Sequence, residues 1–385
     1  MIAHNENLYF SMEKKGMKYD IAIVGGGAMG ACAAYWLSKE KKVILLEQFT
    51  INNELNASID YSKIFRYEYG EETVYTQMAV ESLKLWKEIE KECGKQLYFQ
   101  TGLLLPGGHE ESYIMKSYES LKKLGHGTEL LEGVELERRY PQFKAKFAVV
   151  DTNGGVLEAN SVVNAFITLA KKNGAVIREN VGVKKVDAKT VILENGETIE
   201  CEKIVVVSGS WIRKLLPKLP ITPTKQEVVY FKPEKPEHFT KEVFPVFIHG
   251  DRGYYGVPIH GINAVKVGNH AVGKPVDPEN LDWVVSKEAI DGCRNFIKEY
   301  IPELGDAKIV KAKVCLYDMS PDNHFIIEEI DGIIVGCGFS GHGFKFASLI
   351  GKMLADLALN RENSYLRYFS AKRFENGEKP NFTSE

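Results

Sequence analysis

Two cations in one short stretch could bind an anion. Residues 59–70 read IDYSKIFRYEYG, and Lys63 and Arg66 lie three residues apart among aromatic and apolar side chains. Long charged side chains are rarely buried unless a partner accompanies them. We therefore expect Lys63 and Arg66 to meet solvent, an acidic neighbour or a ligand. For Arg66, the acidic residues Glu68 and Glu71 are close in sequence.

A glycine-rich turn near the N-terminus has the residue spacing that dinucleotide binding requires. Gly25, Gly27 and Gly30 form a GxGxxG pattern between an apolar run and a run of small residues, and Glu47 follows Gly27 by 20 residues. Gly25 permits a tight turn, Gly27 lets the backbone approach a pyrophosphate, and Gly30 allows helix and strand to pack closely. The free N–H groups at the helix start attract phosphates, and Glu47 can accept hydrogen bonds from the adenosine ribose. The pattern predicts a dinucleotide site.

The elements that must position these residues follow from hydrophobic periodicity. Apolar runs predict buried strands, and amphipathic or small-residue stretches predict helices. The predicted elements are strands at 21–24 and 43–46, helices at 28–39 and 73–93, a strand running into small residues at 203–211, and a strand, glycine-rich turn and long helix at 332–359. Residues 223–315 are rich in aromatic residues and proline and alternate in polarity, which predicts an antiparallel sheet carrying a substrate site. We predict an α/β chain, α+β overall, in which three separated segments form one nucleotide-binding domain.

Composition excludes several other classes of protein. The 385 residues are 44% hydrophobic and 26% charged, as in ordinary globular proteins, and 49 Lys and Arg against 52 Asp and Glu leave a formal charge of −3. Without a basic excess, we expect neither a nucleic-acid nor a membrane partner. No run approaches the ~20 apolar residues of a membrane span. Residues 1–11 contain ENLYFS, which looks like a damaged protease-tag scar, so we expect the native chain to begin at Met12 or Met17.

Cysteine spacing argues against a metal site. The six cysteines form no CxxC pair and show no metal-like spacing with histidine. We interpret most of them as reduced, buried thiols, which fits a cytoplasmic protein. No metal is expected.

Four segments together resemble the sarcosine-oxidase branch of the flavoprotein amine oxidases, in the D-amino-acid-oxidase-like superfamily. They are VGGGAMG with Glu47, SKIFRYEYGE (62–71), YYGVP to AVKVGNH (254–270) and KVCLYD to GCGFSGHGFK (313–345), in order along nearly the whole chain. The branch includes monomeric sarcosine, N-methyltryptophan and fructosyl-amino-acid oxidases. The resemblance implies FAD, bound by a Rossmann-type domain interleaved with an antiparallel-sheet substrate domain. The expected division is a tag and disordered start at 1–17, an FAD-binding domain at 18–90, 152–222 and 316–375, and a substrate domain at 91–151 and 223–315.

The resemblance also implies which residues hold the cofactor. Cys315 in KVCLYD stands where this branch forms a thioether to the flavin 8α-methyl group, so we expect covalent FAD; the alternative is a buried structural cysteine. A thiolate can add to the activated methyl group, and the tether makes the ring a better oxidant. His342, in the turn over the flavin, is expected to act through position. The expected cofactor-binding residues are Gly25, Gly27, Ala28, Met29, Gly30, Glu47, Ser62, Lys63, Val183, Ser208, Gly209, Trp211, Cys315, Gly338, Phe339, Gly341, His342, Gly343 and Lys345.

The same resemblance implies roles for five polar side chains. Lys266 in AVKVGNH matches the lysine near flavin N5 that assists oxygen reduction, although strand alternation between two valines would place it on the solvent face. Arg66 and Lys345 match a pair that grips a substrate carboxylate, through an Arg fork and a point charge. Tyr255 and His270 match residues that line the substrate pocket, and His270 is a candidate for tuning the amine's protonation.

The first stretch also departs from the family pattern. Sarcosine oxidases usually carry His-Gly-Asp-Thr-Arg here, whereas Ile59 stands at the expected His and Lys63 at the expected Arg. Lys63 keeps a positive charge over the flavin face, and we count it among the catalytic residues. Compared with arginine, it lacks the planar guanidinium that can donate two parallel hydrogen bonds. The Asp-x-x-Lys-Ile pattern is similar to fructosyl-amino-acid oxidases, which leaves the nitrogen substituent open.

The resulting prediction is an oxidase of secondary amino acids. A hydride equivalent leaves the carbon beside nitrogen for flavin N5, and dioxygen reoxidises the flavin to give hydrogen peroxide. The alternatives are a fructosyl-amino-acid oxidase, a dehydrogenase of the same fold that passes electrons to a partner, and a flavin-binding protein without turnover. The expected partners are the small amino acid and dioxygen, with the protein a monomer or weak homo-oligomer.

Overall fold

One sheet carries the glycine-rich turn within its parallel part. The computed structural model describes residues 18–107, 112–270, 273–377 and 380–383, so the predicted tag and native start lie outside the described residues. In sheet order the strands are β10 (Val183–Asp187), β11 (Thr190–Leu193), β12 (Thr198–Val206), β1 (Tyr19–Val24), β2 (Val43–Leu46) and β9 (Val176–Arg178), with β20 (Ile333–Cys337) beside β12 and β19 (Ile326–Ile330) beside β20. Pairing from β9 through β2, β1 and β12 to β20 is parallel, and the remaining pairs are antiparallel. The predicted strands at 21–24 and 43–46 are confirmed.

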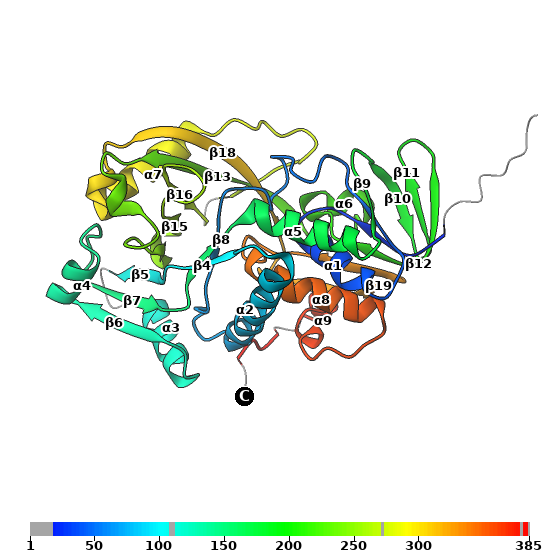
Figure 1. Cartoon of the computed structure of the whole chain (residues 1–385), viewed down its shortest axis with the longest axis horizontal. Helices are drawn as coiled ribbons and strands as arrows, with labels where there is room; N and C mark the ends of the chain where they lie inside the picture. The colour runs from blue at the N-terminus through cyan, green and yellow to red at the C-terminus, as the bar shows by residue number, and fades with distance from the viewer. Residues whose placement is uncertain (1–17, 108–111, 271–272, 378–379, 384–385) are drawn as a thin grey trace, which may run out of the picture.

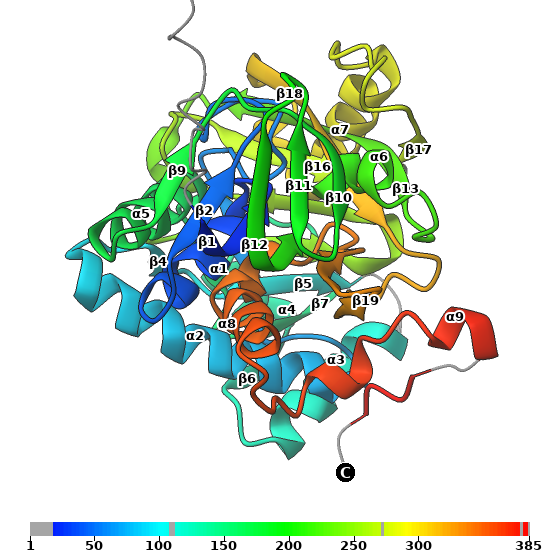
Figure 2. The same cartoon turned by 90° about the vertical axis from the view of Figure 1, so that its right-hand side faces the viewer.

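Helices pack against one another beside this sheet. Its main helices are α1 (Ala28–Ser38), α2 (Thr73–Cys93), α5 (Ala159–Lys172) and α8 (Ala347–Ala358). α1 packs against α5 and α8, and α2 packs against α8, so the predicted helices at 28–39 and 73–93 are confirmed to within one residue (Figure 2). The close approach of α1 and α8 depends on Gly351 in α8, because a Cβ atom there would lie 2.4 Å from the Sγ atom of Cys32 in α1. The strand, turn and helix predicted at 332–359 appear as β20 and α8.

A second, largely antiparallel sheet is built from two separated parts of the chain. In order it contains β17 (Lys274–Pro275), β13 (Thr222–Lys232), β16 (Val265–Asn269), β15 (Tyr254–Val257), β14 (Val246–His249), β5 (Leu103–Gly107), β7 (Phe147–Asp151) and β6 (Thr128–Glu132), with β18 (Lys308–Met319) also paired to β13. The flanking helices are α3 (Ser112–Lys123), α4 (Gly133–Arg139) and α7 (Lys287–Tyr300). The antiparallel sheet predicted within 223–315 is confirmed, and Figure 1 shows it at the opposite end of the molecule from β10 and β11.

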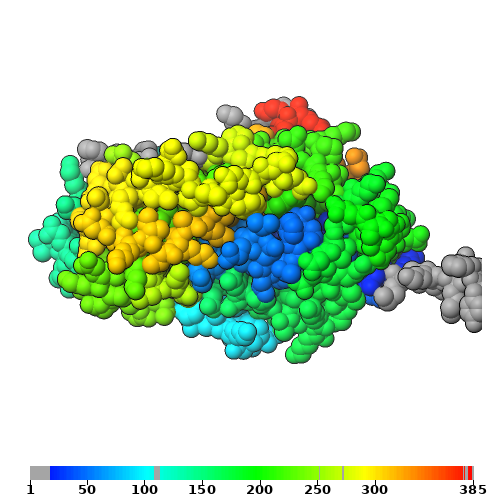
Figure 3. All heavy atoms as spheres, turned by 90° about the horizontal axis from the view of Figure 1, so that it is seen from above, coloured from blue at the N-terminus to red at the C-terminus, as the bar shows by residue number. Residues whose placement is uncertain are grey.

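A small third sheet stands between the other two. It contains β3 (Lys63–Phe65), β8 (Gly155–Leu157) and β4 (Tyr98–Gln100), and it therefore fixes the stretch that holds Lys63 and Arg66. The loop from β2 to β3 crosses to β18, where the Lys313 ammonium donates to the Ile59 carbonyl (Figure 3). The remaining short elements are α6 (Ile212–Leu215), α9 (Arg373–Asn376) and several 3-10 turns, among them η5 (Phe344–Phe346). No helix within the described residues is both long and apolar enough to cross a membrane.

Candidate active site

A single cavity of about 560 Å³ joins the glycine-rich turn to the cationic stretch. Its walls come from β1, β2, β3, β10, β15, β16 and β18 and from the loops that follow β12 and β20. Among the residues predicted from the sequence, the lining contains Gly25, Gly27, Ala28, Met29, Glu47, Lys63, Arg66, Val183, Ser208, Gly209, Trp211, Tyr255, Lys266, His270, Cys315, Phe339, Gly341, His342, Gly343 and Lys345. Gly30, Ser62 and Gly338 are absent from that lining. The predicted cofactor-binding and substrate-binding residues therefore meet around one space.

The glycine-rich turn has the geometry of a dinucleotide cradle. Gly25 has a φ of +112°, which other residues rarely adopt, and a Cβ atom on Gly30 would lie 1.8 Å from the Gly25 carbonyl oxygen. Gly27 precedes the first turn of α1, and Ala28 and Met29 of that turn also line the cavity. Gly30 thus supports the cradle by packing while Gly25 and Gly27 form its surface.

Glu47 closes the cradle at the end of β2. Its carboxylate accepts the Gly26 N–H at 2.6 Å and the Phe49 N–H at 3.0 Å. Burial raises the pKa of Glu47, although these backbone donors oppose that rise. The hydrogen bonds fix the carboxylate in the cavity wall.

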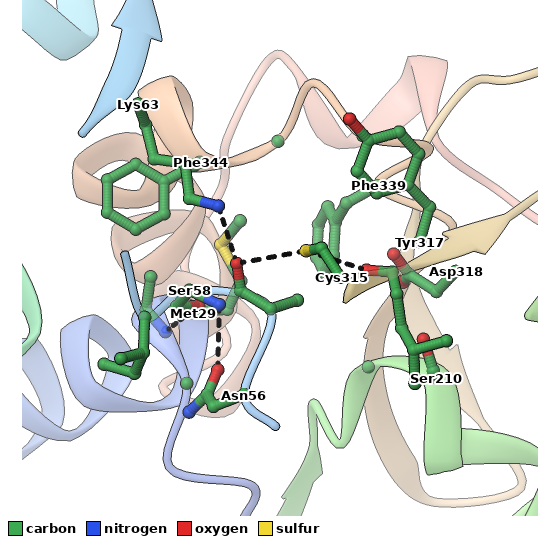
Figure 4. Close-up of a pocket in the computed structure, with 18 of the residues that line it drawn as sticks. Met29, Asn56, Ser58, Lys63, Ser210, Cys315, Tyr317, Asp318, Phe339 and Phe344 are labelled. Atoms are coloured by element: carbon green, nitrogen blue, oxygen red, sulfur yellow. Dashed lines mark hydrogen bonds between the residues drawn. The ribbon is translucent and has the colours of Figure 1, made fainter. Parts of the chain in front are cut away.

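Two cradle residues escaped prediction from the sequence. The Ser58 hydroxyl accepts the Ala28 N–H at 2.9 Å, and the Asn56 side-chain oxygen accepts the Ser58 N–H at 2.9 Å. Both side chains point toward the start of α1 (Figure 4). Asn and Ser are typical of turns, so their presence between two strands was visible, but their contact with a helix 30 residues earlier was not.

Cys315 and Lys63 meet at one backbone carbonyl. Cys315 lies on β18 with its Sγ atom 3.9 Å from the Ala57 carbonyl oxygen, and the Lys63 Nζ atom lies 2.8 Å from the same oxygen (Figure 4). Cys315 is half-buried, lines the cavity and forms no disulfide. A sulfur and an ammonium group thus face the same end of the cavity.

Lys266 is buried in an ion pair. Its ammonium donates to the Asp60 carboxylate at 2.6 Å and to the Ser62 carbonyl at 2.8 Å, and the Tyr230 hydroxyl donates to the other Asp60 oxygen. Burial opposes the charged form of Asp60, but the positive charges of Lys266 and Lys63 outweigh it and hold the pKa of Asp60 below its usual range. The alternation of residues along the strand had placed Lys266 on a solvent-facing side, and this was wrong. β16 lies inside the sheet, between β13 and β15, and side chains on both of its faces are buried.

Arg66 is held by an acidic neighbour. Its Nη1 atom donates to the Glu68 carboxylate, to the Glu68 carbonyl at 2.5 Å and to the Tyr113 hydroxyl at 3.5 Å. The guanidinium carbon lies 4.2 Å from the centre of the Tyr69 ring. Of the partners left open by the sequence, Glu68 is observed, whereas Glu71 pairs with Lys116. Within the described residues, no hydrogen bond uses Nε or Nη2, so that edge of Arg66 remains available in the cavity wall.

Lys345 is the first donor in a hydrogen-bonded chain. Its ammonium donates to the Tyr69 hydroxyl at 2.8 Å and to the His342 carbonyl at 2.8 Å. His342 Nε2 lies 3.0 Å from the Asn323 carbonyl, which can only accept, and burial with the charge of Lys345 lowers the pKa of His342 well below its usual range. The neutral ring therefore carries its proton on Nε2, and Nδ1 accepts from the Tyr69 hydroxyl at 3.1 Å. Tyr69, which the sequence did not single out, orients both Arg66 and Lys345.

His270 and Tyr255 line the same cavity as these cations. Burial, Arg66 and Lys345 lower the pKa of His270 to about 4, so the imidazole is neutral near pH 7. Burial and the neighbouring Tyr317 raise the pKa of Tyr255, which stays a neutral phenol. No cluster of His, Cys, Asp and Glu within the described residues is arranged to hold a metal ion.

Comparison with known proteins places this cavity in a family context. The family model described as FAD dependent oxidoreductase (DAO) matches residues 20–357. Monomeric sarcosine oxidase from Bacillus sp. (strain B-0618) is 32% identical over 375 residues, which cover 92% of this chain and 96% of that protein. N-methyl-L-tryptophan oxidase from Salmonella heidelberg (strain SL476) is 27% identical and covers 93% of this chain and 100% of its own length. The crystal structure of L-proline dehydrogenase from P. horikoshii superposes with a TM-score of 0.83 at 24% identity, covering 94% of this chain and 99% of that one.

Proposed function

The chain belongs to the DAO family of FAD-dependent oxidoreductases, and we propose that it is an oxidase of secondary amino acids that yields hydrogen peroxide. The observation that carries this proposal is the shared cavity, where Arg66 and Lys345 lie beside a neutral His270. A secondary amino acid needs a cationic anchor for its carboxylate and surroundings that tolerate a neutral amine. These surroundings supply both.

The residues of the cavity fit FAD. Gly25, Gly27 and the start of α1 would hold the pyrophosphate, Glu47 the adenosine ribose, and the loop at 338–343 the flavin end. The hydroxyl of Ser208 is buried in this lining with no hydrogen-bond partner among the described residues, which supports a polar group of the cofactor beside it. When bound, FAD supplies two-electron oxidation of the C–N bond and reaction with dioxygen. We assign residues 18–90, 152–222 and 316–375 to FAD binding, and 91–151 and 223–315 to the substrate side.

The side chains of this protein would prepare the substrate for oxidation. The free edge of Arg66 and the third N–H of Lys345 would bind the two carboxylate oxygens, while Tyr255 closes the wall. His270 is neutral near pH 7 because its pKa lies at about 4, so a ring nitrogen can accept a hydrogen bond from the substrate nitrogen. The nearby cations disfavour an ammonium group there, and loss of its proton to solvent frees the nitrogen lone pair, which must assist departure of hydride from the adjacent carbon. Fixing both ends of the substrate supplies much of the rate through orientation.

Lys266 would serve the oxygen half of the reaction. Two of its three N–H groups are taken by Asp60 and Ser62, and the residue lines the cavity. A fixed ammonium stabilises negative charge that develops on dioxygen during its reduction. Lys63 would place a second cation at the flavin end. These two cations support an oxidase over a dehydrogenase that uses a protein partner.

We further propose that FAD is tethered through Cys315 and that the protein works in the cytoplasm. All six cysteines are free thiols, which supports a reducing compartment. Denatured in guanidinium and separated from small molecules, the wild-type chain should keep its yellow colour, and Cys315→Ser should lose it. Cys93→Ser, a half-buried thiol outside the cavity, is the matched control and should keep the colour. Yellow colour released from the wild-type chain would refute the tether.

A second candidate, fructosyl-amino-acid oxidase, rests on Lys63. The order Asp60, Tyr61, Ser62, Lys63, Ile64 keeps the Asp-x-x-Lys-Ile pattern of that group. Asp60 and Lys63 both line the cavity, so either residue can influence which substituent on the substrate nitrogen is accepted.

The experiment that tests the function is a turnover panel in air. Sarcosine, N-methyltryptophan, pipecolate, proline, saccharopine and fructosyl-glycine are each supplied, and oxygen uptake is measured with peroxide. We expect at least one N-substituted amino acid to give one peroxide for each oxygen consumed. Turnover of fructosyl-glycine alone would favour the second candidate. Turnover only with an artificial electron acceptor, without peroxide, would contradict the oxidase and favour a dehydrogenase.

A further inference from the structure

Glu68 is a buried carboxylate directly behind the proposed substrate anchor. Its side chain is 0% exposed and contacts Arg66 Nη1, whereas the Arg66 side chain is 15% exposed. Burying an acid is unfavourable unless it is paired and hydrogen-bonded. If Arg66 served only to attract an anion, a carboxylate in contact with it would weaken that attraction. Glu68 therefore sets how much of the charge of Arg66 reaches the cavity.

Besides Arg66, two neighbours fix the position of Glu68. Its second carboxylate oxygen accepts the Ser117 hydroxyl at 2.8 Å, and its backbone N–H donates to the Asp151 carboxylate at 3.3 Å. Asp151 also accepts the Tyr67 N–H at 2.6 Å. Arg66 thus presents a single edge, Nε and Nη2, in a fixed orientation over the Tyr69 ring.

A small group of side chains sets the charge at this edge. Arg66 contacts the negative Glu68, so this ion pair is close to neutral, and the carboxyl groups of Asp151 and Glu72 lie near the pair. Lys345 has no carboxylate partner among the described residues. Burial and Arg66 lower the pKa of Lys345, and a carboxylate bound beside it would favour the charged form. The edge is therefore suited to one carboxylate, and a second carboxylate on the same ligand would be left without a partner.

We propose that Glu68 is a specificity-determining residue that restricts this site to ligands with one carboxylate. The inference rests on the proposed function, because it takes Arg66 and Lys345 as the carboxylate anchor. Neutral N-substituents are accepted on this basis, and a substrate with a second carboxylate near the first is disfavoured. Glu68 acts by lowering the positive charge that Arg66 offers.

Glu68→Gln removes the charge and preserves the contacts. The amide oxygen can accept from Arg66, the amide nitrogen can donate to the Ser117 oxygen, and Ser117 can then turn its single hydroxyl hydrogen to the Tyr113 carbonyl, 2.9 Å away. The matched control is Glu71→Gln, which removes an exposed carboxylate that pairs with Lys116 outside the cavity lining. Thermal unfolding of both variants checks that the fold is retained.

The test is calorimetric titration of the holoenzyme with acetate and with malonate. We expect Glu68→Gln to bind malonate about tenfold more tightly than wild type, with a smaller gain for acetate, because removal of a nearby negative charge favours the dianion more. Glu71→Gln should match wild type for both anions. The same affinities in wild type and Glu68→Gln, including no binding to either, would overturn the inference and leave Arg66 a structural ion-pair partner. That result is distinct from failure of the proposed function, in which no amino acid of the turnover panel is oxidised.

Discussion

Lys266 illustrates how the residues that line the cavity depend on partners far away in sequence. It lies between two buried valines on β16 and is 4% exposed. Its ammonium is compensated by Asp60, a residue 206 positions earlier. Burial lowers the pKa of Lys266 and the Asp60 carboxylate opposes that shift, which supports the proposed role of a cation near dioxygen.

Substitution of Lys266 by Met should separate the two halves of the reaction. Met keeps the length of the side chain and removes the charge. We expect the rate at which the reduced protein reacts with oxygen to fall by about 100-fold or more, while anaerobic reduction by substrate changes far less. Stopped-flow measurement of each half-reaction checks this. Lys308→Met, at an exposed lysine on β18, is the control, and unchanged oxygen reactivity in Lys266→Met would remove Lys266 from the mechanism.

The cations of the site could be predicted from the sequence, and their acidic partners largely could not. Residue type, the GxGxxG spacing and family resemblance pointed to Arg66, Lys345 and Lys266. Asp60 appeared only as part of a motif, and Glu68 as one of two acids close to Arg66. Which acid contacts each cation depends on the path of the backbone, which β3 and its neighbouring strands set. The strand pairings that fix this path join segments far apart in sequence.

At the scale of elements, the unit from β1 through α1 to β2 carries the most local information. Each of its features is encoded within 30 residues, which is why its strands and helix matched prediction closely. Gly30 is the point where α1 meets the preceding turn, because a side chain there would collide with the Gly25 carbonyl. Packing of this helix start determines whether the cradle can form.

Gly30→Ala should therefore damage the cradle. A Cβ atom 1.8 Å from a backbone oxygen forces the turn and helix apart. We expect the free energy of unfolding to fall by about 3 kcal/mol or more and most of the FAD to be lost during purification. Denaturant unfolding and the ratio of flavin to protein absorbance measure both effects.

Gly94→Ala provides the control for this prediction. Gly94 ends α2 with a φ of +67° and has open space around its Cβ position. The expected cost is about 1 kcal/mol of backbone strain, with full FAD content. Equal FAD loss in both variants would show that Gly30 has no special role in the cradle.

The second sheet was harder to predict than the first. The alternation of polar and apolar residues identified an antiparallel sheet within 223–315. It assigned Lys266 to solvent because this kind of reasoning assumes that one face of the sheet is exposed to solvent. In the structure β16 has neighbours on both sides and is covered on both faces, so alternation carries no information there. The strands β5, β6 and β7 come from residues 91–151, which the family resemblance had assigned to the same domain, but their order in this sheet is seen only in the structure.

At the scale of the whole molecule, the chain passes back and forth between two sheets and leaves a cavity where they meet. β1, β2 and the loop after β12 line the part of the cavity that we propose binds the dinucleotide, and β15, β16 and β18 line the part that we propose binds the substrate. This interleaving explains why residues that act together are scattered from Gly25 to Lys345. It also places the proposed carboxylate anchor and the cofactor cradle around one continuous space, which is the central claim about function.

Anaerobic titration of the purified holoprotein tests that claim most directly. Sarcosine and N-methyl amino acids are compared with the matching amines that lack the carboxylate, such as dimethylamine for sarcosine, and the visible flavin absorbance is followed. We predict that an N-substituted amino acid removes this absorbance, that its matching amine does not, and that admission of air restores the absorbance with formation of peroxide. Flavin that dithionite reduces but no secondary amino acid reduces would contradict the account.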